Sequence, residues 1–238
     1  MSTNPQAAFP DFNYERPDLE KAEKAFRAVL AELKSADSIN AAIAAVEQID
    51  SIRAGIATMQ NISYIRYSID TRDEFYKAEK AWFDEYLPAT QGWSMDYYRA
   101  LINSDHREAL EQKFGSQIFD TAELSIKTFQ PEIIEDMQAV NKGFSEYTQL
   151  KGGAEIKLDG ETYNLSSSIP LEQVADREAG QRASKAKWDW MGEHSERFET
   201  IYNDLVQVRH GMAKKLGYDN YVGLGYANMN RTDYGPEQ

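Results

Sequence analysis

The sequence predicts a mainly α-helical protein, an array of long antiparallel helices with one small β-hairpin at about residues 154–165. Apolar residues recur every three or four positions over most of the chain, which is the spacing of one helix face. Helix-start and helix-stop residues such as Pro131 and Gly217 separate these runs. After Gly153 the pattern changes to alternating apolar and polar residues around an Asp-Gly pair, which is typical of a hairpin.

The first part of the chain predicts an arm and two helices. Residues 1–16 read as an extended arm with scattered aromatic side chains, and a helix follows over residues 18–34. Asp37 and Ser38 are alternative N-caps for the second helix. This helix extends to about residue 69, and its length is therefore about 45 Å. One apolar face runs along it and contains Ile39, Ile43, Val46, Ile49, Ile52, Ile56 and Met59.

The middle of the chain predicts one more long helix and three shorter ones. Thr71 begins the long helix, and Pro88 is expected to kink or interrupt it together with Gly92. Asp105 and Glu108 match a capping box, in which an acid follows the cap by three residues. The shorter helices are expected at residues 105–114, 116–129 and 131–150.

The hairpin prediction depends on the Asp159-Gly160 pair. These two residue types supply the positive φ angles that a type I′ turn needs. The flanking strands alternate so that Ile156 and Leu158 share an apolar face with Tyr163 and Leu165. An isolated hairpin is only marginally stable in water, so this face is expected to pack on the helices.

After the hairpin no proline intervenes between residues 176 and 216, and one helix of about 60 Å is expected there. Asp219 is expected to cap a last short helix that ends near Asn230. We find no internal repeat and no linker, so residues 1–238 are expected to form a single helical region. A seam at alternating three- and four-residue spacing should pack on other helices: Phe198, Ile201, Leu205, Val208 and Met212.

The last residues, Gly235-Pro236-Glu237-Gln238, have two interpretations. Proline is favoured at the first helical position, and an acid after it suits the positive end of the helix dipole. The segment therefore reads either as the beginning of another helix or as a frayed tail.

Composition excludes several classes of function. The formal net charge is -13, which argues against nucleic acid and against anionic membrane surfaces as partners. The absence of cysteine excludes disulfides, thiol nucleophiles and cysteine-ligated metals. The N-terminus has no signal-peptide pattern and no apolar run is long enough to span a membrane, so the expected location is the cytoplasm.

No complete active site can be assembled from the motifs. The three histidines, His106, His194 and His210, lie outside any His-Glu-x-x-His or Glu-x-x-His spacing. His194 is expected to pack against neighbouring side chains, and His106 is expected to be solvated. His210 is expected near the C-terminal end of its helix, where a positive charge interacts favourably with the helix dipole. No catalytic, cofactor-binding or metal-ligating residue is therefore assigned to this chain.

Acidic and aromatic side chains offer candidates that have simpler structural interpretations. Acids such as Glu20, Glu23 and Glu32 are expected on solvated helix faces. Aromatic residues at helical spacing are more often core than ligand contacts. The aromatic candidates are Tyr64 and Tyr67, Trp188 and Trp190 on either side of Asp189, and Tyr218, Tyr221 and Tyr226.

A fixed order of motifs carries a family resemblance. The segments are 156–165 (Ile-Lys-Leu-Asp-Gly-Glu-Thr-Tyr-Asn-Leu), 176–178 (Asp-Arg-Glu), 201–209, 212–221, 225–226 and 229–234 (Met-Asn-Arg-Thr-Asp-Tyr). In this order they resemble the oligoendopeptidase F family of zinc peptidases, which are relatives of thimet oligopeptidase. The resemblance is strongest over about residues 155–238.

The resemblance implies a mostly helical, two-lobed enzyme that cuts short peptides in the cytosol. In that family zinc is held by the two histidines of His-Glu-x-x-His and by a Glu on a following helix, and the Glu inside the motif activates water. These residues follow the Arg-x-Asp-Tyr segment, and none of them maps onto this chain. The chain alone is therefore expected to bind no catalytic zinc and to be inactive.

Three functional hypotheses remain open at this stage. The chain is the N-terminal, cleft-forming part of such a peptidase, or one half of a split peptidase with a complementing catalytic half, or a non-catalytic helical scaffold that binds other proteins. If a catalytic part is missing, apolar surface near residues 198–234 should be exposed.

Overall fold

The computed structural model describes residues 8–235 and residue 237. The helix start expected at Pro236 lies outside the described residues, as does the beginning of the arm. The elements, in chain order, are η1 (Phe9–Asp11), α1 (Leu19–Lys34), α2 (Ile39–Ile69), α3 (Glu74–Ile102), α4 (Arg107–Phe114), α5 (Gln117–Ser125), η2 (Pro131–Ile133), α6 (Ile134–Gly152), β1 (Ile156–Leu158), β2 (Glu161–Tyr163), α7 (Ile169–Glu172), α8 (Arg177–Glu193), α9 (Ser195–Lys215) and α10 (Tyr221–Asn228).

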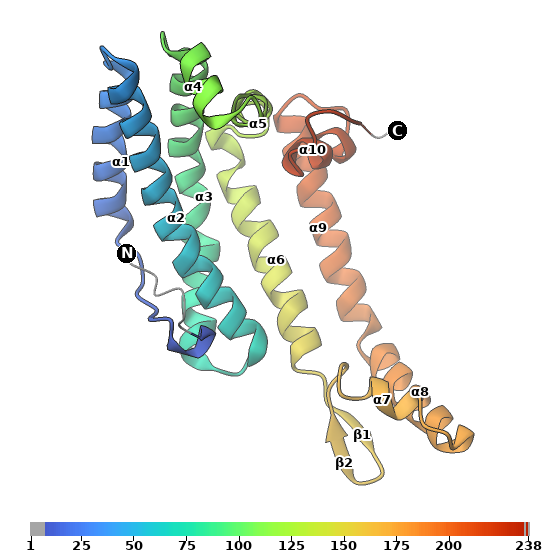
Figure 1. The fold of residues 1–238 in the computed structure, drawn as a ribbon. Helices are drawn as coiled ribbons and strands as arrows, with labels where there is room; N and C mark the ends of the chain where they lie inside the picture. The colour runs from blue at the N-terminus through green and yellow to red at the C-terminus, as the bar shows by residue number, and fades with distance from the viewer. Residues whose placement is uncertain (1–7, 236, 238) are drawn as a thin grey trace.

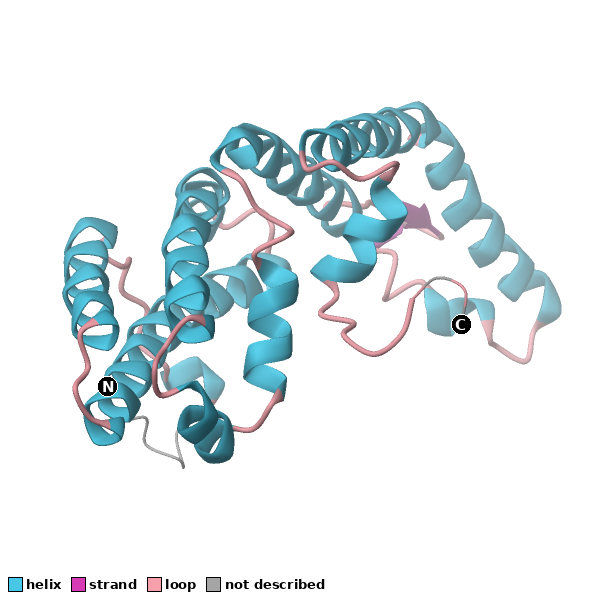
Figure 2. Cartoon of the chain, turned by 90° about the horizontal axis from the view of Figure 1, so that it is seen from above, coloured by secondary structure: helices cyan, strands magenta, loops and turns pink. Residues whose placement is uncertain are grey.

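The long helices lie side by side, and each packs mainly on its neighbour in the array (Figure 1). α1 and α2 pack on α3, α3 packs on α6, and α6 packs on α9. Seen from above, the helices follow an arc and do not close into a bundle (Figure 2). The small hairpin projects beside α7 and α8 at one end (Figure 1). This arrangement confirms the predicted class of a helical array with one hairpin.

Side-chain caps define where the first three long helices begin. Asp18 accepts a hydrogen bond from the Lys21 N–H (2.9 Å), and Ser38 accepts one from the Ala41 N–H (3.3 Å). Ser38, not Asp37, is therefore the cap of α2. The third helix begins at Glu74 and not at Thr71, because the carboxylate of Asp73 takes the first free backbone N–H groups.

Pro88 does not interrupt α3, which runs unbroken from Glu74 to Ile102. A proline has no N–H to donate to the carbonyl four residues earlier, which here belongs to Asp84. In this structure Asn141 on α6 donates to the Asp84 carbonyl (3.5 Å), and Gln138 donates to the carbonyl of Glu85 (2.6 Å). The neighbouring helix therefore satisfies the Asp84 carbonyl that Pro88 leaves free, and the interruption alternative is wrong.

The single helix expected over residues 176–216 is also wrong, because it breaks at His194. α8 ends at Glu193 and α9 begins at Ser195, while His194 lies between them with φ -106° and ψ 6°. The His194 ring stacks on Trp190 with 4.2 Å between ring centroids. The break lets α8 pack on the hairpin while α9 packs on α6, two surfaces that one straight helix does not reach together.

Two expected caps are shifted by one residue. Asp105 makes no capping hydrogen bond, and His106 is the residue that precedes α4. The last helix is capped by Asn220 and not by Asp219, since the Asn220 side chain accepts from the Val222 N–H (2.8 Å). In both cases the backbone enters the helix one residue later than the sequence pattern indicated.

The hairpin forms as predicted. Asp159 and Gly160 have φ angles of 51° and 88°, so both turn residues take the left-handed conformation. The register places Ile156 opposite Tyr163. Ile156 is only 1% exposed and packs with Trp190 of α8, which confirms that the hairpin packs on the helices.

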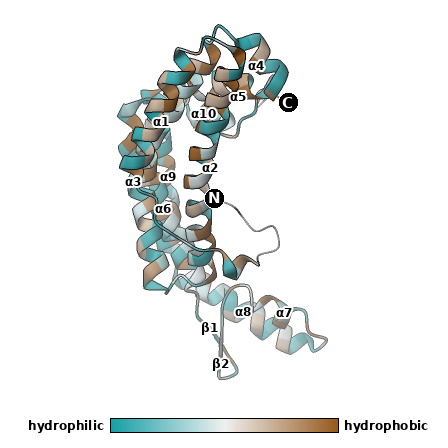
Figure 3. Ribbon diagram, turned by 60° about the vertical axis from the view of Figure 1, so that its left-hand side comes forward, coloured by the Kyte–Doolittle hydropathy of each residue, from teal (hydrophilic) through white to brown (hydrophobic). Residues whose placement is uncertain are grey.

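The described residues form four apolar clusters, and the two largest hold the helical array together. The larger joins α1 to α5 around Phe26, Ile49 and Leu101. The second joins α3, α6, α9 and α10 around Met95 and Leu224. Hydrophobic segments are visible along α2 and around α5 and α10 (Figure 3). Burial of these side chains, at about 25 cal/mol per Å² of apolar surface, is the main favourable contribution to the fold.

A buried polar cluster connects α3 to α6. The Lys80 ammonium pairs with the carboxylate of Asp84, and both side chains are about one-tenth exposed. Ser145 on α6 contacts both groups: Lys80 donates to its hydroxyl (2.7 Å), and the hydroxyl donates to Asp84. The Tyr67 hydroxyl of α2 donates to the Ser145 carbonyl (3.2 Å), so three helices meet at one ion pair.

A second ion pair fixes the N-terminal arm to α3. Arg16 donates to both carboxylate oxygens of Glu79 at 2.9 and 2.5 Å, and Tyr14 donates to the same group (2.5 Å). Glu79 is buried while Arg16 is half-exposed. Hydrogen bonds from Arg16, helped by Tyr14, hold the pKa of Glu79 below its ordinary value of 4.5.

The substitution Asp84→Asn should destabilise the protein by about 3 kcal/mol, because it leaves the Lys80 ammonium buried without a counter-charge. Urea unfolding followed by helical circular dichroism measures this free energy. The matched control is Glu23→Gln, which breaks the exposed pair between Glu23 and Arg27 at the same i,i+4 spacing. It should cost less than about 1 kcal/mol. Equal losses in the two variants would contradict a buried ion pair.

The contribution of Glu79 should depend on pH. Its pKa is lower in the folded state than in the unfolded state, so the stabilisation is fully present above pH 4.5 and is lost as pH falls through the folded pKa. At neutral pH Glu79→Gln should lower the free energy of unfolding by about 1.5 kcal/mol, near the lower limit for hydrogen bonds to a charged group. Unfolding curves of both proteins should converge in acid; a pH-independent difference would refute the linkage.

Candidate functional site

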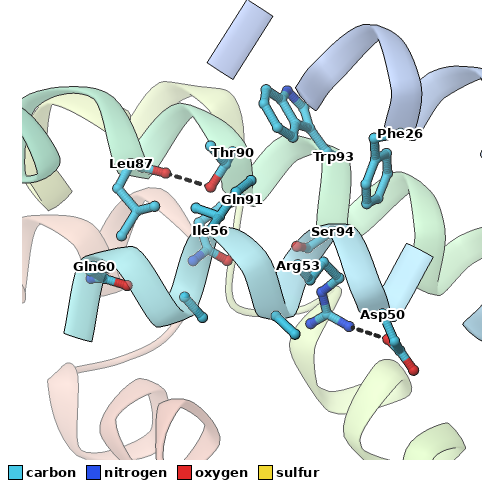
Figure 4. Close-up of a pocket in the computed structure, with 12 residues that line it drawn as sticks. Phe26, Asp50, Arg53, Ile56, Gln60, Leu87, Thr90, Gln91, Trp93 and Ser94 are labelled. Carbon is cyan, nitrogen blue, oxygen red and sulfur yellow. Dashed lines mark hydrogen bonds and ion pairs between the residues drawn. The ribbon is translucent and has the colours of Figure 1, made fainter. Parts of the chain in front are cut away.

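A pocket of about 440 Å³ opens between α1, α2 and α3 (Figure 4). Phe26 of α1 and Trp93 of α3 form an aromatic wall, with 6.0 Å between ring centroids. Asp50 and Arg53 line the pocket from α2, and the polar side chain of Gln91 lines it from α3. This is a mixed polar and apolar surface on three well-packed helices.

The charges in this pocket are already paired within the chain. Arg53 contacts the carboxylate of Asp50 (3.2 Å) and donates to the Tyr98 hydroxyl (2.8 Å). Its guanidinium also lies over the rings of Tyr97 and Tyr98, 5.5 and 5.3 Å from their centroids. Among the described residues that line the pocket there is no histidine and no cluster of metal-ligating side chains.

Tyr97 lies fully buried under Arg53. Its hydroxyl has no hydrogen-bond partner in the described part of the chain. Burial raises the pKa of this phenol above its ordinary value of 10, and the nearby Asp50 carboxylate adds to the effect. Tyr97 therefore stays neutral and acts as a packing residue.

The structure does not bring the three histidines together. The Nε2 atom of His106 is 3.2 Å from the Ala36 carbonyl, so this ring is partly buried and not solvated as expected. His194 is packed as expected, with Nδ1 2.8 Å from the Trp190 carbonyl. His210 is exposed on α9. Among residues 8–235 and 237, no three His, Cys, Asp or Glu side chains are arranged to hold a metal ion.

The acidic and aromatic candidates have mainly structural positions. Glu20 and Glu32 are exposed, and Glu23 pairs with Arg27. Tyr67 is buried and Tyr64 partly buried, as expected for core aromatics. Trp188 departs from this expectation because it is 63% exposed, whereas Trp190 is 8% exposed. Tyr218 and Tyr221 pack on the second core, and Tyr226 meets Tyr234 edge-on.

The ordered motifs after the hairpin also have local structural partners. Asp176 caps α8 by accepting from the N–H groups of Glu178 and Ala179. The Arg209 guanidinium lies over the Tyr221 ring at 5.6 Å. Arg231 lies over the ring of Tyr234 at 4.8 Å. These contacts give the motif residues structural positions: Asp176 caps a helix, and the two arginines lie over tyrosine rings.

A family model for the peptidase M3 N-terminal domain matches residues 9–129, slightly more than half of the chain. The chain belongs to the M3 peptidase family. The family model covers the arm and helices α1 to α5, the region that holds the larger core and the pocket of Figure 4.

Two solved structures match nearly the whole chain. One is PZ peptidase A with an inhibitor, at 44% sequence identity and a TM-score of 0.94 over 97% of this chain. The other is assigned as an oligoendopeptidase F from Bacillus anthracis strain Ames, at 42% identity and the same TM-score over 97% of this chain. The chain spans 41% and 42% of their lengths. No curated protein sequence matches the chain.

Sequence reasoning did not identify the pocket of Figure 4 or a groove of about 520 Å³ between β1 and α8. Asp50 and Arg53 sit three residues apart on α2, but that spacing is common on any solvated helix. The pocket depends on helix packing, which no local motif encodes. The hairpin itself was predicted, whereas the groove beside it depends on the break at His194.

The substitution Tyr97→Phe should leave the free energy of unfolding unchanged or raise it by about 1 kcal/mol, because it removes a buried hydroxyl that has no partner. The control is Tyr67→Phe, which removes the hydrogen bond to the Ser145 carbonyl and should cost about 1 kcal/mol. Urea unfolding compares the two variants. A larger loss for Tyr97→Phe than for Tyr67→Phe would show that the Tyr97 hydroxyl is bonded in solution.

Proposed function

We propose that this chain forms the N-terminal, cleft-forming part of a zinc-dependent oligoendopeptidase that hydrolyses short peptides in the cytoplasm. The observation that carries the proposal is the match of its first half to the M3 peptidase N-terminal domain. The near-complete overlay on two larger solved structures supports it. Within the described residues, no helix combines the length and the apolar content needed to cross a membrane.

The residues that the structure describes do not fit a zinc site. The described acids and histidines form no group of three that could hold a metal ion. The His194 ring stacks on Trp190, and its Nδ1 atom is 2.8 Å from the Trp190 carbonyl. In this proposal zinc and the water-activating acid therefore belong to sequence beyond this chain, and the chain alone has no hydrolytic activity. Its own contribution is a rigid helical wall that limits which substrates reach the catalytic part.

Exposed apolar side chains on α9, on α10 and in the segment after α10 suit contact with that catalytic part. Tyr202 is 72% exposed, and Val206, Val222, Met229 and Tyr234 are also exposed. This matches the apolar surface expected near residues 198–234. Ile201 and Met212 of the same seam are buried, so α9 packs on the array with one face and presents the other.

Two alternative hypotheses use the same exposed surface. In a split peptidase a separate polypeptide, the complementing catalytic half, packs there. In a non-catalytic scaffold another protein binds there and no peptidase activity is ever found. Co-purification from the source cell followed by peptide hydrolysis assays separates these alternatives, since only the first yields activity on mixing.

The purified chain of residues 1–238, supplied with zinc, should not cleave an internally quenched peptide. The product of the longer reading frame, or a mixture with a complementing half, should cleave it and should lose this activity with a chelator. The fluorescence increase on cleavage measures both. Zinc-dependent cleavage by residues 1–238 alone would refute the assignment of catalysis to sequence outside the chain.

A further inference from the structure

A groove lies between β1 and α8, away from the pocket of Figure 4. Its volume is about 520 Å³, and residues 153–157 form one wall. The opposite wall is the C-terminal half of α8, with Asp189, Trp190 and Glu193, followed by His194. Neither the family model, which ends at residue 129, nor the pocket of Figure 4 includes this surface.

The register of the hairpin leaves a free strand edge in this groove. The two-residue turn is closed by Leu158 and Glu161, and Lys157 lies opposite Thr162. In an antiparallel hairpin of this type the closing pair is hydrogen-bonded and the next pair is not. The N–H and C=O groups of Lys157 therefore point away from β2. Glu155 precedes β1, and a third strand that extends the same alternation would meet its backbone groups on the same edge.

Contacts behind this edge hold it in place. Ala154 and Ile156 are buried against Trp190, which is stacked in turn on His194. At the turn, Arg182 of α8 pairs with Asp159 (3.6 Å). An edge strand that is rigid and extended loses little conformational entropy when another strand pairs with it.

The charges of the groove favour a positively charged occupant. Glu155 and Glu193 are exposed and have no ion-pair partner among the described residues. Asp189 is neutralised by Lys185 (2.5 Å). Lys157 supplies a single positive charge, so the carboxylates outnumber it on the two walls.

We propose that this groove binds a short extended peptide with basic side chains, which adds to β1 as a third strand. Main-chain hydrogen bonds to Glu155 and Lys157 supply affinity with little dependence on peptide sequence, and the free carboxylates select basic residues. The inference rests on the proposed function, because it identifies peptides as ligands of the same protein. It adds a binding surface remote in sequence from the zinc motif.

A binding experiment on the zinc-free chain tests this inference. The probe is an acetylated, amidated hexapeptide that alternates valine and lysine, followed by tryptophan fluorescence and by amide chemical shifts. The amides of Glu155 and Lys157 should shift on titration. A peptide of the same sequence with alternate backbone nitrogens methylated should bind at least about fivefold more weakly, because it cannot pair with a strand. Equal affinity for the two peptides would overturn the proposal.

Matched variants test whether the peptide pairs with the β1 edge and whether the groove carboxylates contribute to binding. Lys157→Pro removes an outward N–H without removing a β1–β2 hydrogen bond, and it should weaken binding at least about fivefold. Thr162→Pro makes the same change on the opposite edge and should bind as the wild-type chain does. Glu193→Gln should weaken binding at low salt, whereas Glu32→Gln on α1 should not. Equal effects of the two proline variants would exclude the β1 edge.

The outcome is separable from that of the proposed function. If the hexapeptide fails to bind but the longer gene product cleaves peptides, this inference is wrong and the proposed function stands. If the hexapeptide binds with the expected variant pattern and no form of the protein cleaves peptides, the groove is confirmed and the peptidase proposal fails. Circular dichroism of Lys157→Pro establishes that it is folded, and the methylated peptide tests the edge without any mutation.

Discussion

The contact between α3 and α6 is the constraint on which the rest of the array depends. At this contact Ser145 of α6 bonds to both members of the Lys80–Asp84 pair. Asn141 donates to the Asp84 carbonyl that Pro88 leaves free, and Gln138 donates to the neighbouring Glu85 carbonyl. A buried ion pair or free carbonyl is costly unless its partners are in place. Sliding or separating α3 and α6 would break several of these interactions at once, so the register of the two helices is fixed.

This junction connects the two parts of the molecule. On one side α1, α2, α4 and α5 complete the larger core, and on the other α9 packs on α6 through Arg197–Glu146 and Lys215–Asp136. Within the described residues, the array is open beyond α9, where α10 packs and where apolar side chains such as Tyr202 and Val206 are exposed.

Sequence reasoning succeeded where a local rule decides the structure. The amphipathic repeats gave the long helices, and the Asp159-Gly160 pair gave the turn. It failed where tertiary contacts outweigh the local rule. Pro88 breaks isolated helices, but Asn141 bonds to the carbonyl that it leaves free here. No proline stands near His194, yet the helix ends there, two residues after Gly192, and α8 and α9 pack on different partners.

The sequence by itself determined the helical class, the hairpin, the family and the lack of a metal-ligand motif, because each depends on residue type and short spacing. Only the tertiary structure decided the path of the array, the pocket around Arg53 and the groove along Lys157. These surfaces are formed by residues far apart in the chain. Their shape depends on how helices pack, and that information is spread over many buried contacts and not held in any motif.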